Sequence, residues 1–172
     1  MTQIDFVSYM RSLASMSTLI NHNEQNKRFY RVSGMHSLGE LLVNLRNAEV
    51  PAIGADDGFE GRLMDNRGDS ITDRQYYAFY VFGREHLYDH DQNETEKRTI
   101  KQIALSFVKK ILADRSSDFN METSHGLRHL DVNSISYRTL APLPDGIIAM
   151  AVSFVIDNSL NTKQDPSHWN FE

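Results

Sequence analysis

The order of elements in the C-terminal half of the chain is the feature that most constrains its fold. Residues 76–82 are an aromatic run that predicts a strand, and residues 94–113 have the apolar spacing of an amphipathic helix. Two further strand patterns follow, joined by a turn at residues 142–146. A strand, a helix and then a hairpin is the arrangement of a small α+β domain with one helix laid on an antiparallel sheet.

The helix at residues 94–113 is well specified by its ends and by its apolar stripe. Asn93 and Glu96 form a capping pair, and Asp89, Asp91 and Glu94 place negative charge near the positive end of the helix dipole. The lysines lie away from most of the stripe, so we expect a solvated basic face, with an acidic neighbour as the alternative. The stripe comprises Ile100, Ile103, Ala104, Phe107, Ile111 and Leu112.

The strands are predicted from alternation along the chain. In the last strand, bulky residues (Ile148, Met150, Val152, Phe154 and Ile156) share one parity and small residues (Ala149, Ala151 and Ser153) share the other. The preceding strand changes parity, which predicts a bulge near Asn133 and Ser134. Residues 76–82 are bulky on both faces, as in a central strand that another element or another subunit covers on each side.

The N-terminal half has weaker signals. Thr2 can cap a helix that runs to Asn21, and residues 27–33 read as a short strand. Residues 37–46 predict a short helix or turn, and residues 49–53 an edge strand, because Pro51 cannot donate to a ladder. Residues 54–70 are rich in Gly, Asp and Asn and predict an exposed loop or a flexible hairpin.

Composition bounds the class of protein. With 172 residues and 40% apolar content, we expect one α+β domain at residues 1–157, followed by a C-terminal arm at residues 158–172. The expected sheet is antiparallel or mixed, with about four to five strands packed by the N-terminal helix and the central helix. The chain has no cysteine, which removes disulfides and thiolate sites and suits a reducing compartment. We see no secretory signal at the N-terminus.

Charge and hydropathy argue against two further classes. The longest nearly apolar stretch, residues 147–156, is half of the roughly 20 residues that a membrane-spanning helix needs, so we expect no membrane anchor. A net charge of -5 argues against a DNA-coating role, because neutralising phosphates needs a clustered excess of Lys and Arg. A surface with this net charge would suit a protein past which DNA slides without binding.

One cluster invites chemistry. His86 and His90 are four residues apart with Asp89 between them, as a zinc or iron site could use, and His125 and His129 repeat the spacing. The first pair joins a strand to a helix, where polar residues collect, and Gly126 interrupts the second pair. No nucleophile elbow and no phosphate-binding loop accompany them. We therefore expect no catalytic site and no cofactor, with a metal-dependent enzyme as the alternative.

The order of elements resembles a known family. An N-terminal helix, an early strand with Pro51, an aromatic strand, a capped helix and a closing hairpin with Pro142 and Gly146 are similar to the small tail-terminator and head–tail joining proteins of tailed bacteriophages and prophages. The ending at residues 165–169 also resembles proteins of such gene clusters. The resemblance implies a virion protein, assembled in the host cytoplasm, that forms a ring at the tail end or neck. That ring is expected to be sixfold.

A ring subunit would use its flanks and extremities. The expected partners are further copies of the chain and other phage tail or connector proteins, with DNA only transiently in the lumen. Candidate interface residues are Tyr77, Tyr80, Leu160, Trp169 and Phe171. Acidic residues that could line the channel and repel DNA are Asp56, Asp57, Glu60, Asp65 and Asp69. A monomeric adaptor protein is a further alternative.

Overall fold

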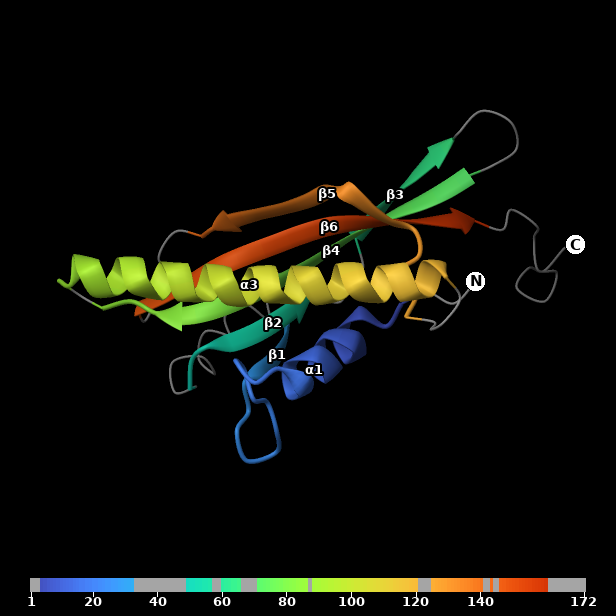
Figure 1. Cartoon of the computed structure of the whole chain (residues 1–172). Coiled ribbons are helices and arrows are strands. Elements are labelled where there is room, and N and C mark those ends of the chain that lie inside the picture. The colour runs from blue at the N-terminus through green and yellow to red at the C-terminus, as the bar shows by residue number, and fades with distance from the viewer. Residues whose placement is uncertain are drawn as a thin grey trace, which may run out of the picture.

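The computed structural model describes residues 4–32, 49–56, 60–65, 71–86, 88–120, 125–140, 143 and 146–160, with the backbone alone at residue 160. Figure 1 shows one twisted sheet with the helices against it. In chain order the elements are α1 (Phe6–Met16), β1 (Phe29–Val32), β2 (Ala52–Asp56), β3 (Glu60–Asp65), β4 (Ile71–Arg84), α3 (His90–Phe119), β5 (Leu130–Thr139) and β6 (Ile147–Leu160).

The strands form a mostly antiparallel sheet in the order β1-β2-β4-β6-β5. The β1–β2 pair is parallel and the other pairs are antiparallel. Strand β4 is long enough to hold two partners end to end on one side, β3 along residues 71–76 and β2 along residues 79–82. The predicted α+β class is confirmed, and the described residues form six strands where about four to five were expected.

The two described helices, α1 and α3, cover the same face of the sheet. The bulky residues of β6, which lie on one side of the strand, pack under the helices, as the alternation of that strand predicts. The centre of this core is aromatic: the Phe6 ring of α1 lies 5.1 Å from that of Tyr77 and 5.5 Å from that of Phe154. Farther along, Phe107 of α3 packs on Phe79 of β4 with ring centroids 6.1 Å apart.

The other face of β4 is covered unevenly. Phe82 is buried there in a second cluster with Val32, Ala52, Ile147 and Ala149. Tyr80 is half-buried and stacks on Phe82 at 6.1 Å, but Tyr76 is exposed. Within one subunit, β4 is therefore covered on both faces at the Phe82 end, and its outer face at Tyr76 is open to solvent.

Helix α3 is longer than predicted at both ends. Asp89 is the N-cap and accepts a bond from the Gln92 N–H at 2.9 Å, so the prediction of a cap at Asn93 was wrong. The Asn93 amide instead bonds both backbone groups of His86. At the other end the helix continues past residue 113 to Phe119, because Asp114 and Asp118 carry the buried stripe onward at helical spacing.

The N-terminal half corrects three predictions. Helix α1 is capped by Asp5, which accepts from the Ser8 N–H at 3.0 Å, and it ends at Met16, well before Asn21. Thr2 lies outside the described residues. Strand β1 confirms the strand predicted at residues 27–33, but β2 begins after Pro51 and lies between β1 and β4, not at an edge. The helix or turn expected at residues 37–46 lies outside the described residues.

The C-terminal hairpin confirms the predicted bulge. The β5–β6 register shifts between Asp131 and Ser136. Within the shift the Ser134 hydroxyl donates to the Asp131 carbonyl at 2.6 Å and accepts from the Val155 N–H at 2.8 Å. Strand β6 runs on to Leu160, so the first three residues of the predicted arm belong to the sheet, where they pair with residues 71–73.

Candidate functional site

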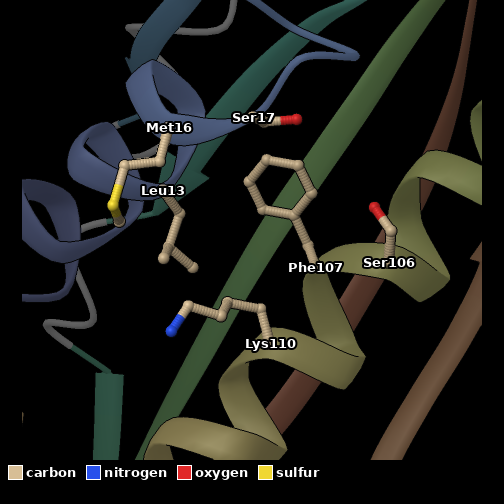
Figure 2. Close-up of a pocket in the computed structure, with 6 residues that line it drawn as sticks. All are labelled: Leu13, Met16, Ser17, Ser106, Phe107 and Lys110. Carbon is tan, nitrogen blue, oxygen red and sulfur yellow. The ribbon is translucent and has the colours of Figure 1, made fainter.

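Among the described residues, a groove between α1 and α3 is the hollow that we consider as a candidate site. Its inner part has a volume of about 210 Å³ and is largely apolar. Figure 2 shows that Leu13 and Met16 of α1 face Phe107 and Lys110 of α3 across it. Met16 is two-thirds exposed, at 66%, although its neighbour Leu13 is buried. The groove therefore offers an apolar wall to solvent.

The outer part of the groove has more polar side chains among its lining residues, including Tyr9, Lys110 and Asp114. It has a volume of about 500 Å³ and shares Leu13, Met16 and Lys110 with the inner part. Tyr9 donates a hydrogen bond to Asp114 Oδ2 at 2.8 Å, and Lys110 donates to Asp114 Oδ1 at 2.5 Å. Burial, and then the bond to Asp114, raise the pKa of Tyr9 well above its usual range. Tyr9 therefore stays protonated, and its hydroxyl ties α1 to α3.

Asp118 fixes the segment that closes the outer end of this groove. Its side chain is buried, at 6% exposure, and accepts the backbone N–H groups of His125 and Leu127, both at 2.8 Å. His125 then packs against the Tyr9 ring, with centroids 5.6 Å apart. Asp114 and Asp118, one helical turn apart, thus set the walls of the groove.

The edges of the sheet are a second kind of surface. Strand β5 is one end of the strand order, and β1 is the other, with β3 off that path beside β4. The Leu140 N–H bonds the Ala149 carbonyl at 2.9 Å. Because bonding alternates along an antiparallel pair, Arg138 also bonds inward, and the N–H groups of Tyr137 and Thr139 point away from β6. Strand β5 therefore presents backbone donors at its outer edge.

On the opposite flank, β3 and the first half of β4 project past the C-terminal end of α3 (Figure 1). Arg74 of β4 forms a bidentate pair with Asp157 of β6, with both N–O distances at 2.8 Å. The hydrogen bond from Arg74 lowers the pKa of Asp157. Arg62 of β3 lies directly opposite Arg74. The projection is thus a three-stranded piece of sheet with mixed charge.

Among the described residues, the predicted acidic side chains do not form one patch. Glu60 and Asp65 are the ends of β3, so residues 60–65 are a strand within a hairpin and not a loop. Five positions separate these two exposed residues, which places their side chains on opposite faces of the strand. Asp56 is half-buried at the end of β2. Asp57 and Asp69 lie outside the described residues.

The predicted interface residues are also separated. Tyr77 is 2% exposed and packs in the core, where its hydroxyl donates to Gln75 Oε1 at 2.6 Å, so it offers no surface in the folded subunit and that assignment was wrong. Tyr80 lies on the face of the sheet opposite the helices, and burial raises its pKa. Leu160 is the last residue of β6. Trp169 and Phe171 lie outside the described residues.

The histidine cluster has a local explanation. Asp89 is engaged as the cap of α3, and the His86 backbone bonds Asn93. Tyr88, between them, has a positive φ of 68° and a fully exposed side chain, as in a tight turn that leads into a helix. In the described part of the chain, no group of three or more His, Asp or Glu side chains is placed to hold a metal ion.

No protein-family model matches the chain, and no curated protein matches it in sequence. Among the described residues, no helix has both the length and the apolar character needed to cross a bilayer.

The residues of the groove were not singled out from the sequence. Phe107 read as an ordinary member of the apolar stripe at residues 94–113, and the pairing of Tyr9 with Asp114 spans 105 positions. One signal was present, because Asp114 and Asp118 continue the stripe of α3 by steps of three and four after Ile111. A carboxylate on a buried stripe indicates a partner on another element.

Proposed function

We propose that the protein is a structural subunit of a tailed bacteriophage or prophage, which assembles into a ring at the tail end or the head–tail neck through which DNA passes. The ring is proposed to contain six copies, to bind other tail or connector proteins and to perform no catalysis. Its assembly takes place in the host cytoplasm, and its final location is the virion.

One observation carries this proposal: the described sheet has unlike edges on its two flanks. A ring forms when one surface of each subunit binds a different surface of the next, so that contacts repeat head to tail until they close. Strand β5 supplies a ten-residue edge on one flank, and the exposed strand β3 supplies a projecting edge on the other. Strand addition at such edges gives affinity through backbone hydrogen bonds.

The charge of the chain is compatible with a channel. A net charge of -5 leaves a surface that DNA phosphates do not bind strongly. Within the described residues, Glu60 and Asp65 are the exposed members of the acidic set. Because they face opposite sides of β3, one of the two at most lines a lumen in any given ring.

The experiment that tests the proposal blocks the β5 edge without breaking the hairpin. In Thr139→Pro, the substitution removes an N–H that points away from β6, and proline is tolerated at such edge positions. Thr139→Ala is the matched control, because it shortens the same side chain and keeps the N–H. Mass in solution is measured over a range of concentrations, with circular dichroism to verify the fold.

We expect wild type and Thr139→Ala to form the same closed oligomer, and Thr139→Pro to remain a folded monomer. A wild-type protein that is monomeric at every concentration contradicts the ring and favours an adaptor role. Unchanged assembly of folded Thr139→Pro shows that the β5 edge is not the contact.

A further inference from the structure

The groove between α1 and α3 has the size and lining of a receptor for aromatic side chains. A cavity of about 150 Å³ lined by apolar side chains accommodates a benzene ring. The inner part of the groove, at 210 Å³, is larger than this and is walled by Leu13, Met16 and Phe107. It therefore has room for one aromatic ring.

The chain itself contains a segment with matching chemistry. Residues 161–172 follow β6, and they include Trp169 and Phe171 in an otherwise polar stretch. Two residues at this spacing point to the same side of an extended segment, about 7 Å apart. One aromatic ring can then enter the inner part of the groove while the other lies over the outer part.

The polar groups of the groove suit the neighbours of these aromatic residues. The outer part carries the hydroxyls of Ser8 and Ser12 and the ring of His125, which can accept the indole N–H of Trp169. Glu172 directly follows Phe171. The Lys110 ammonium, on a side chain that is 52% exposed, lies at the junction of the two parts and offers this carboxylate an opposite charge.

The direction of β6 favours a second copy as the source of the segment. Phe107 at the inner part of the groove packs on Phe79, which pairs with Val152 of β6. From Val152 the strand runs eight residues to Leu160, which carries the chain about 26 Å beyond the inner part of its own groove. If the chain continues in the direction of β6, it moves away from the inner part of its own groove and toward a neighbouring subunit. To return to its own groove, the chain must reverse its direction.

We infer that the groove between α1 and α3 binds residues 161–172 of a second copy of this chain, with Trp169 and Phe171 as the two anchors. This inference rests on the proposed assembly, because each subunit then receives one arm and donates one. It adds a contact between neighbouring subunits that is separate from the sheet edges, because it joins the C-terminal arm of one subunit to the groove of the next.

Trp169 makes the contact measurable, since it is the one tryptophan of the 172 residues. In the full-length protein, we expect its emission to move to shorter wavelength, and its quenching by acrylamide to fall several-fold, as concentration rises through the range in which mass increases. A Trp169 that stays accessible in the assembled oligomer refutes the arm contact and leaves the ring proposal standing. A Trp169 that is protected in the monomer, independently of concentration, overturns the assignment to a second copy.

A second measurement does not depend on ring formation. A labelled peptide of residues 158–172 is titrated into full-length protein whose own anchors are removed by Trp169→Ala and Phe171→Ala. We expect saturable binding that is lost with Met16→Asp, which places a carboxylate on the apolar wall. The matched control is Leu19→Asp, because Leu19 is also exposed, at 51%, but does not line the groove.

The two measurements separate the possible failures. Binding that Met16→Asp abolishes and Leu19→Asp preserves supports the groove even if no ring is found. Two results refute the groove as the receptor, whatever the oligomeric state. One is an equal loss of peptide binding in Met16→Asp and Leu19→Asp, and the other is no binding of the peptide by the protein that lacks its own anchors.

Discussion

Replacing Asp118 with alanine tests how the fold builds the outer wall of the groove. The Asp118 carboxylate accepts two backbone N–H groups, from His125 and Leu127, at 2.8 Å each. These bonds hold residues 125–127 of the segment that leads from α3 to β5. Leu127 is fully buried, so its N–H has no access to water when the carboxylate is removed.

The expected loss in the free energy of unfolding follows from these two hydrogen bonds. A hydrogen bond to a charged group contributes about 1.5–3 kcal/mol, so these two bonds together contribute at most about 6 kcal/mol. The loss is smaller because His125 is half-buried and its N–H can find water, and because removal of the carboxylate relieves its own desolvation cost. We expect Asp118→Ala to lower the free energy of unfolding by about 2–4 kcal/mol, a large part of the 5–15 kcal/mol typical of a domain.

Urea denaturation followed by circular dichroism measures this difference. Asp118→Asn keeps one acceptor oxygen and should lose about half as much stability as Asp118→Ala. Ser116→Ala serves as control, because its hydroxyl bonds the Leu112 carbonyl at an exposed position of the same helix. A loss below about 1 kcal/mol for Asp118→Ala, or an equal loss for Ser116→Ala, refutes the reasoning that these two bonds hold the segment.

Three further outcomes are expected from urea denaturation. Phe6→Ala should cost about 3–5 kcal/mol, since its ring packs in the aromatic centre of the core; a cost near zero contradicts that packing. Gly83→Ala should cost about 1–3 kcal/mol, because a Cβ there lies 2.8 Å from Ile100 Cγ2; unchanged stability contradicts the close approach of β4 and α3. Arg74 lowers the pKa of Asp157 below 3.8, so the difference between wild type and Asp157→Asn should be present above pH 3.8 and vanish as pH falls through the lowered value; a difference constant with pH argues against the pair.

The parts of the fold that were predicted correctly are those that local pattern determines. Alternation in β6 identified the face that packs under the helices, and the parity change in β5 located the bulge. The stripe of α3 followed from periodicity in the same way, and the strand at residues 27–33 followed from a run of β-prone residues. In each case, the pattern that indicates which residues are buried lies within a few positions along the chain.

The parts that were wrong depend on partners far along the chain. Asp89 and Asn93 are both good capping residues, and the choice between them depended on Asn93 bonding the backbone of His86. The end of α3 was placed too early because Asp114 and Asp118 look like surface residues. Their partners are Tyr9 and the backbone after the helix, which no local window contains.

The site was harder to predict than the fold for a related reason. Tyr77 was placed at an interface because its segment is aromatic on both faces, but the helices cover the face that it occupies. Glu60 and Asp65 are close in sequence, yet a strand places them on opposite faces. Similarly, Met16 and Phe107 meet across the groove through the packing of α1 against α3.

The central claim is that many copies of this chain close into a ring. Negative-stain electron microscopy of the purified full-length protein, with Thr139→Pro beside it, tests this claim most directly. We predict closed rings with a central opening and six copies for wild type, and no rings for Thr139→Pro. Wild-type particles that remain single subunits, or that grow into open filaments at every concentration, would contradict it.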